Sequence, residues 1–359
     1  MSFTVEDLRA AVAAGVLTEA QAASVTALAN DRAGKRSALP AEDEPFEFFR
    51  GFSEIFISIG LIILLVGIVA LVTIMSAGLL LSAIPLITAV VAWWFAGYFT
   101  LKRRMTLPSM VLAVAFGTGL VAFVFTVVAP TLANGRLISI VGFGLATVGM
   151  VGWYLRFKLP FAAFLTGCFA LGVVYSVTAS AANVAGVVTG GLMGNAGLES
   201  MFDLTESPAF ASATLLFGIG AFLVGMWFDT RDPYRLGRHS ATAFWCHLLA
   251  APALVNTVAI TLMNGGGTGV LAIALVLITL LALVIDRRSF LTAAIVYIAI
   301  VISWVMGEGD GYTPIFVLLV LGAFITAIGT WWVQLRAAVM NLLPDFPGKS
   351  RLPPYGSTE

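Results

Sequence analysis

The chain has 359 residues, of which 60% are hydrophobic and only 11% are charged, and its mean hydropathy is +1.00. A soluble domain of this length cannot bury so much apolar surface, so the composition excludes a soluble protein. It predicts an all-α polytopic membrane protein whose main partner is the lipid bilayer. The 19 basic residues are balanced by 19 acidic ones, which gives no basic surface for nucleic acid.

Residues 1–30 are expected to form a small cytosolic helical hairpin. Gly15 suits the left-handed position that ends a helix, and Thr18 with Gln21 has the spacing of a capping box at the start of the next one. A hairpin of about thirty residues is too small to fold robustly alone. We therefore expect it to pack on the membrane domain, on a second copy of the chain or on a partner protein. Residues 31–53 follow as a linker and an interfacial aromatic helix.

Ten apolar segments of spanning length come next and form a membrane domain over residues 54–336. They cover residues 54–75, 79–100, 107–128, 136–155, 160–180, 208–228, 240–261, 268–285, 289–306 and 313–334. Every Lys and Arg except Arg136 falls on one side of this arrangement, and cations concentrate on the cytoplasmic side of membrane proteins. The pattern predicts ten spans with both termini in the cytoplasm and a cytosolic tail at 337–359.

The connection at 181–207 is long for a simple turn. Small residues recur every four positions in it, at Ala182, Gly186, Gly190 and Gly194. Such a ridge permits close helix contact, so one interpretation is a periplasmic or partly re-entrant helix. A flexible glycine-rich loop is the other interpretation, since glycine also serves as a helix breaker.

The connections on the outer side are acidic. Their carboxylates are Glu199, Asp203, Glu206, Glu308 and Asp310. The simpler interpretation is that they are solvated loop residues. The functional one is a cation-attracting outer mouth, which requires the two loops to converge in space.

His247, in the stretch FWCHLLAAP (244–252), is the ionisable ring placed well inside a span. Three interpretations are open: a neutral ring hydrogen-bonded to a neighbouring helix, a solute- or proton-binding group in a cavity, and a metal ligand. Metal binding comes last because Cys246 is the only nearby soft ligand and one His–Cys pair cannot fill a site.

A cavity is expected between the third, fourth, fifth and seventh spans, which are rich in Gly and Thr. Its candidate residues are His247, Cys246, Asn256, Pro252, Cys168, Tyr175, Thr178 and Thr118. Pro252 can kink its helix, and the hydroxyl groups can contribute hydrogen bonds to a solute.

No Asp, Glu, Lys or Arg occupies the middle of a span. Asp229 and Asp286 stand at cytosolic ends beside Arg231 and Arg287, where snorkelling and local pairing explain them. The lack of carboxylates at mid-depth counts against a proton- or cation-coupled transporter and against an intramembrane aspartyl protease. HExxH, GxSxG and Walker motifs are also missing. We expect no enzyme activity, no metal and no cofactor.

The hairpin sequence AVAAGVLTEAQAASVTAL resembles the N-terminal signature of an uncharacterised bacterial family of polytopic inner-membrane proteins, in which a Gly-x-Leu/Ile-Thr turn precedes a Gln-bearing helix. HSATAFWCHLLAAPALV (239–255) is similar to a segment of proteins of that kind. The resemblance implies a bacterial inner-membrane location and assigns no activity or site residues.

The sequence therefore favours transport or binding of a small uncharged or weakly polar solute. The alternative is a non-transporting scaffold or stress sensor that binds its partner through the N-terminal hairpin.

Overall fold

The computed structural model describes residues 5–18, 21, 25, 52–76, 80–127, 134–178, 201–231, 238–265, 267–287, 290, 313–349 and 352. Every regular element in these ranges is a helix. The chain divides into two compact units, residues 1–45 and residues 46–359, which are described separately.

The N-terminal unit begins with α1 (Val5–Ala13). Gly15 follows it with a φ of +72°, in the left-handed region predicted for the helix end. The amide of Thr18 donates to Gln21 Oε1 at 2.9 Å, and the amide of Gln21 donates to Thr18 Oγ1 at 3.2 Å. The predicted capping box is therefore confirmed, although most of the residues of the helix predicted after it lie outside the described part of the chain.

The second unit contains the apolar helices. In chain order they are α3 (Phe52–Met75), α4 (Ile84–Ala96) with its π-helical continuation η1 (Gly97–Lys102), α5 (Thr106–Val127), α6 (Gly135–Phe157), α7 (Phe161–Thr178), α9 (Pro208–Asp229), α10 (Arg238–Gly265), α11 (Gly267–Ile285), α13 (Thr313–Thr330) and α14 (Trp332–Leu342). Among the described residues, seven helices, from α3 to α10 with η1 counted as part of α4, are long and apolar enough to cross a bilayer. They match the first seven predicted spans. The ninth predicted span, residues 289–306, lies outside the description apart from Phe290, as does 181–200 of the long connection.

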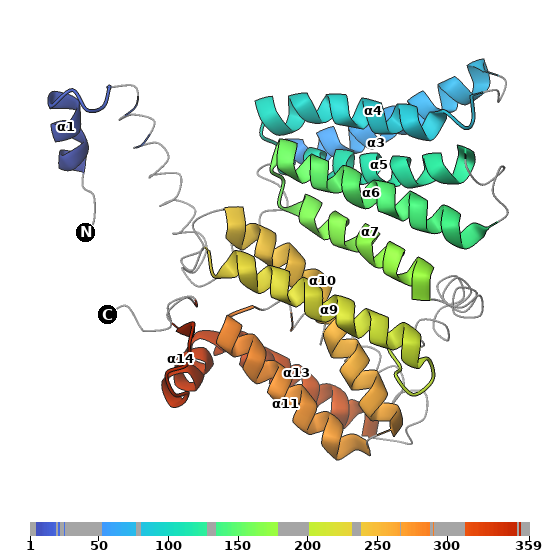
Figure 1. Cartoon of the computed structure of the whole chain (residues 1–359). Helices are drawn as coiled ribbons and strands as arrows, with labels where there is room; N and C mark the ends of the chain where they lie inside the picture. Colours follow the sequence, from blue (N-terminus) through green and yellow to red (C-terminus); the bar gives the residue numbers. More distant parts are fainter. Residues whose placement is uncertain are drawn as a thin grey trace. The chain divides into compact units, whose positions relative to one another are not determined.

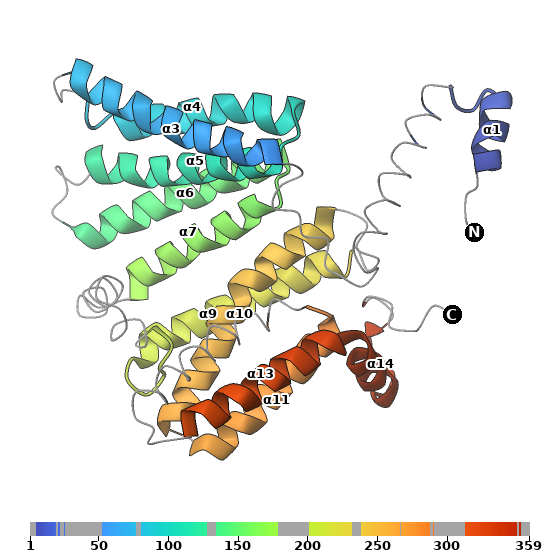
Figure 2. The same cartoon turned by 180° about the vertical axis from the view of Figure 1, so that it is seen from behind.

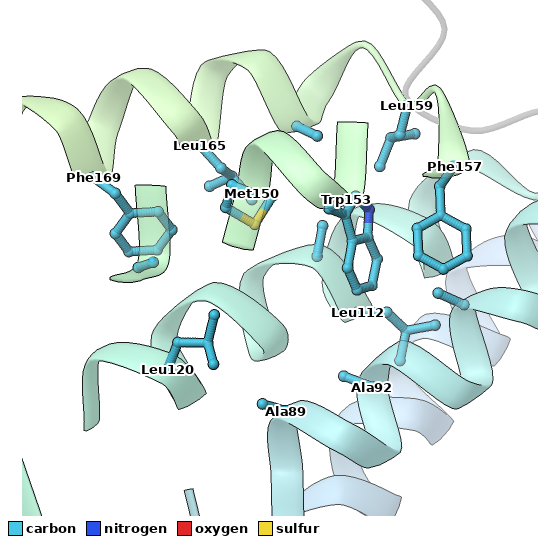
Figure 3. Close-up of a cluster of buried hydrophobic side chains, with 14 of the residues drawn as sticks. Ala89, Ala92, Leu112, Leu120, Met150, Trp153, Phe157, Leu159, Leu165 and Phe169 are labelled. Carbon is cyan, nitrogen blue, oxygen red and sulfur yellow. The ribbon is translucent and has the colours of Figure 1, made fainter. Parts of the chain in front are cut away.

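Helices α3 to α7 lie side by side in the same unit (Figures 1 and 2). Their core is aromatic at one end, where Trp153 is fully buried beside Phe157 (Figure 3), with 4.6 Å between the two ring centroids. The ring centroid of Phe116 lies 5.0 Å from that of Trp153. On the neighbouring helix pair, a Cβ added to Gly119 would lie 2.8 Å from the carbonyl oxygen of Pro85. Glycine is required there because α4 and α5 approach backbone to backbone.

Glu54 is a buried carboxylate in the first turn of α3. Its Oε2 accepts hydrogen bonds from the amides of Thr106 and Leu107, both at 3.0 Å. These amides belong to the first turn of α5, where free N–H groups and the helix dipole favour a negative charge. The contact satisfies the buried carboxylate and fastens the start of α3 to the start of α5.

The remaining described helices of this unit are α9, α10, α11, α13 and α14, and α7 contacts α9 and α10. The hydroxyl groups of Tyr175 in α7 and Thr214 in α9 lie 2.9 Å apart, within hydrogen-bonding distance. Helices α9 and α10 run antiparallel in close contact, since a Cβ on Gly218 would lie 2.9 Å from the Cβ of Ala253. This tight pair carries both of the sites described next.

Candidate functional site: a buried ionic cluster beside an apolar cavity

Asp229, His247 and Arg287 meet between α9, α10 and the end of α11. His247 Nε2 lies 2.9 Å from Asp229 Oδ2, and Arg287 Nε donates to the same oxygen at 3.0 Å. A guanidinium Nη of Arg287 also contacts Asp229 Oδ1, which makes the pair bidentate. We call these three residues the ionic cluster.

The three side chains of the ionic cluster are buried inside the protein. His247 and Arg287 are 0% exposed and Asp229 is 6% exposed. Because a carboxylate held by a bidentate guanidinium is ionised and can only accept, the Nε2 of His247 carries the hydrogen in this contact. A further bond from Arg287 Nη2 to the carbonyl oxygen of Ser240, at 3.1 Å, ties the guanidinium to the first turn of α10.

Gly225 makes room for the imidazole. A Cβ at this position would lie 2.8 Å from His247 Cε1 and 2.9 Å from Nε2, so the ring rests directly on the backbone of α9. Gly225 precedes Asp229 by one helical turn, which places the flat backbone surface and the carboxylate on the same face. Phe222 and Phe290 enclose the ring, with centroids 5.5 and 6.0 Å from its own.

Asp286, which directly precedes Arg287, binds a different helix. Its φ of +55° ends α11 in the left-handed region, which aspartate tolerates better than most residues. Trp332 Nε1 in α14 donates to Asp286 Oδ1 at 2.7 Å, and Arg336 Nε lies 3.6 Å from that oxygen. Two neighbouring residues at one turn therefore attach α11 to α14 on one side and to α9 and α10 on the other.

The cluster corrects the local pairing expected for the aspartates. Arg231 does not pair with Asp229: its guanidinium carbon lies 3.6 Å from the centroid of the Trp227 ring. Asp229 instead binds an arginine 58 positions away. The sequence predicted a hydrogen-bond partner for His247 on a neighbouring helix as one possibility, but it did not identify Asp229. The sequence did contain a clue to this pairing, because the predicted topology places Asp229, Arg287 and the nearer end of the His247 helix on the same side of the membrane.

An apolar cavity of about 420 Å³ lies on the other side of the α9–α10 pair, between these helices and α6 and α7. The polar side chains among its lining residues are Tyr154, Thr166 and Cys246, and the remainder are Gly, Ala, Val, Leu and Phe. The Thr166 hydroxyl donates to the carbonyl oxygen of Ala162 at 2.7 Å, and the Tyr154 hydroxyl lies 3.3 Å from that of Thr242. Because these hydroxyls already have partners, the cavity offers its occupant mainly hydrocarbon.

The structure places Cys246 alone of the eight candidate cavity residues in the wall of this cavity. His247 is the next residue but points into the ionic cluster, and Asn256 and Pro252 lie further along α10. The remaining candidates are elsewhere: Tyr175 against Thr214, Thr178 against the carbonyl oxygen of Val174, Thr118 exposed on α5, and Cys168 half-buried on α7. The cavity is lined by the fourth, fifth and seventh predicted spans as expected, with the sixth in place of the third.

Of the proposed outer-mouth residues, Asp203 and Glu206 are described. Asp203 is buried and accepts from the amide and hydroxyl of Thr205 at 2.8 and 2.6 Å, whereas Glu206 is exposed. Glu199, Glu308 and Asp310 lie outside the described residues. Within the described part of the chain, no three His, Cys, Asp or Glu side chains gather as ligands for a metal ion.

The seven apolar helices of spanning length among the described residues identify the chain as a multi-pass α-helical membrane protein. No family model, no curated protein and no solved structure matches it.

Proposed function

We propose that the protein binds a small apolar or weakly polar molecule in the cavity between α6, α7, α9 and α10, and moves it across the membrane. The observation that carries this proposal is the cavity itself. Its volume of about 420 Å³ falls within the range of small-molecule sites. A strongly polar solute would lose its hydrogen bonds to water in such surroundings and gain few in return.

Entry from the bilayer fits the exposure of two residues that line the cavity. Val151 of α6 and Val224 of α9 line the cavity and are also 43% and 48% exposed on the flank of the helices. Both valines lie inside apolar spans, in the part nearer to Phe157 and Asp229, and exposed apolar surface within a span faces lipid chains. The occupant is therefore a molecule that already dissolves in the membrane or partitions into it.

For its setting we propose ten spans, both termini in the cytoplasm and a bacterial inner membrane. The α11 and α13 helices coincide with the eighth and tenth predicted spans, and the cation pattern supports the orientation. The resemblance of the N-terminal hairpin to bacterial inner-membrane proteins supports the location.

Cysteine labelling tests this orientation. Lys102→Cys and Arg136→Cys, each in a chain without Cys168 and Cys246, are expected to react differently with a membrane-impermeant maleimide added to intact spheroplasts. Arg136→Cys should be labelled and Lys102→Cys should be labelled only after lysis. Labelling of both from outside would contradict the proposed topology.

Filling the cavity tests the proposed function. A Cβ on Gly220 has no atom within 4 Å, so Gly220→Leu should extend its side chain into the cavity without a clash. In a Cys168→Ala background, N-phenylmaleimide, a small uncharged probe, reports entry by reacting with Cys246. We expect Gly220→Leu to slow this reaction about tenfold, because the leucine occupies the space the probe needs.

Gly144→Leu is the matched control, since Gly144 also has no atom within 4 Å of its Cβ position but lies outside the cavity lining. It should leave the rate unchanged, and equal rates in all three proteins would contradict binding. Transport has its own readout, the passage of the weakly polar solute isobutyramide into proteoliposomes above its rate in protein-free liposomes, followed by light scattering, which Gly220→Leu should reduce. Deleting residues 1–40 should leave both readouts intact; a scaffold acting through its hairpin would instead lose its partner and show no flux at all.

A further inference from the structure

The cavity extends along about half the depth of a membrane. Its lining residues on α9 run from Phe217 to Phe228, which is about 16 Å along the helix, and those on α7 run from Ala163 to Ala170, which is about 10 Å. The hydrocarbon core of a bilayer is about 30 Å thick, so one lipid chain fills about half of it. The cavity therefore matches the length of a single lipid chain in one leaflet.

The cavity lies at one end of its four helices. Tyr154 lines it three residues before the end of α6, and Phe228 lines it one residue before the end of α9. Ala163, the third residue of α7, lines it as well. The rings of Tyr154 and Phe228 have centroids 6.5 Å apart, and the Tyr154 hydroxyl lies 3.3 Å from that of Thr242 in the second turn of α10. The polar end of an occupant would therefore meet the α6–α7 and α9–α10 connections.

Basic residues are concentrated in these two connections. Residues 156–160 and 230–239 together contain five Lys or Arg and one Asp. Four of the five cations are exposed in the structure, namely Arg156, Lys158, Arg231 and Arg238. The fifth cation, Arg235, and the single acid, Asp232, lie outside the described residues. An excess of cations at the end of an apolar cavity favours an anionic group there.

Arg231 is held close to this end of the cavity. Its guanidinium carbon lies 3.6 Å from the centroid of the Trp227 ring, and that ring lies 4.8 Å, between centroids, from the ring of Phe228. A guanidinium that lies flat on an aromatic ring keeps its N–H groups at its edge, in the plane in which a carboxylate can accept two parallel hydrogen bonds. Arg231 is thus suited to bind a carboxylate next to the cavity.

An apolar wall cannot by itself select an occupant, because the surrounding lipid chains are as apolar as the wall. Selection has to come from the polar end. We propose that the cavity binds a long-chain carboxylate, with the alkyl chain in the cavity and the carboxylate among Arg156, Arg231 and Arg238. This inference rests on the proposed function, since it names the class of molecule that the cavity takes up. A fatty acid suits that function because it has one chain, dissolves in the membrane and is weakly polar once protonated.

Protection of Cys246, which lines the cavity, tests the choice of head group. The Cys168→Ala chain is labelled with N-phenylmaleimide in lipid nanodiscs that contain dodecanoate or dodecanol, at about pH 8, where a carboxylic acid is ionised. The two molecules have chains of the same length and differ in charge. We expect dodecanoate to halve the labelling rate at a membrane mole fraction about tenfold lower than dodecanol, because the arginines attract only the anion. Equal protection by the two molecules would overturn the proposal.

Two double variants show whether the cations beside the cavity are responsible. In Arg156→Gln with Arg231→Gln, the advantage of dodecanoate should fall to within about twofold. Lys102→Gln with Arg104→Gln is the matched control, because it removes two cations from the predicted cytoplasmic side, at the connection between α4 and α5, and neither of those helices lines the cavity. The control should keep the tenfold advantage. An advantage that survives in the first variant, or that falls equally in both, would contradict a carboxylate site at the cavity.

The outcomes separate this inference from the proposed function. If dodecanoate and dodecanol protect Cys246 equally while Gly220→Leu slows labelling and isobutyramide entry, the cavity binds apolar molecules and the carboxylate site is wrong. If neither molecule protects Cys246 and Gly220→Leu changes neither readout, the proposed function is wrong and the carboxylate site with it.

Discussion

Replacing Arg287 with leucine is expected to lower the free energy of unfolding by about 3–5 kcal/mol. The loss is expected because the Asp229 carboxylate stays buried after its arginine partner has been removed. Asp229 is 6% exposed and receives two of its hydrogen bonds from Arg287, so the variant leaves a buried negative charge with His247 as its main partner. The measurement is unfolding in mixed micelles with increasing SDS, followed by tryptophan fluorescence and circular dichroism.

Two further variants identify the cause. Asp345→Asn removes a carboxylate whose pair with Lys349 is at the surface, with the Asp345 side chain 99% exposed, and should leave the unfolding midpoint unchanged. The double variant Asp229→Leu with Arg287→Leu should recover most of the loss, because replacing a whole buried pair by apolar side chains is often nearly neutral. A loss of less than about 1 kcal/mol in Arg287→Leu alone would show that Asp229 is accessible to water.

Gly225→Leu is expected to cost about 3 kcal/mol, at the upper end for overpacking. A Cβ alone would lie within 3.0 Å of three atoms of the His247 ring, and the ring cannot retreat far because Phe222 and Phe290 enclose it. The ring must leave Asp229, so the variant loses packing and a buried hydrogen bond together. SDS-induced unfolding measures the loss.

Gly220→Leu is the control for this prediction as well as the cavity-filling variant. The two glycines are five positions apart on α9, and the substitution is the same, but the Cβ of residue 220 meets open space. The free energy of unfolding should therefore stay the same or rise when leucine fills the cavity. If Gly225→Leu proved as stable as Gly220→Leu, the close seating of His247 on α9 would be wrong.

The local features of the chain could be predicted because each depends on a few neighbouring residues. Gly15 and the Thr18–Gln21 pair fix a helix end and a helix start by short-range hydrogen bonding, and the structure confirms both. The first seven spans are predictable for a related reason. A segment of about 20 apolar residues has few stable places other than a membrane, whatever its neighbours are.

The ionic cluster could be predicted only in part. The sequence marks His247 as an unusual residue at depth and places Asp229 and Arg287 near one membrane surface, but it favours the nearer Arg231 as a partner. That choice depends on which face of α9 carries Asp229 and on where the α11 end lies, and neither is a local property. Only the packed helices bring together residues 58 positions apart.

The cavity shows the same division. Glycine-rich spans predict close contacts, yet Gly220 lines the cavity with no atom within 4 Å of its Cβ position, while Gly119 and Gly225 lie against a neighbouring helix. Because glycine has no side chain, its position in the sequence does not show whether it marks a close contact between helices or the wall of a cavity. The distinction rests on the side chains of the opposing helix.

The sequence by itself determined that this chain is a membrane protein, that its elements are helices, and where most of those helices begin and end. The physical reason is that only apolar segments whose backbone groups are hydrogen-bonded within the segment are stable in the hydrocarbon of a bilayer. The tertiary structure alone decided which helix faces meet. That choice seals Asp229, His247 and Arg287 together and leaves a cavity on the opposite side of the same two helices, because the fit between helices depends on side-chain shape across pairs of helices and not on the composition of either one.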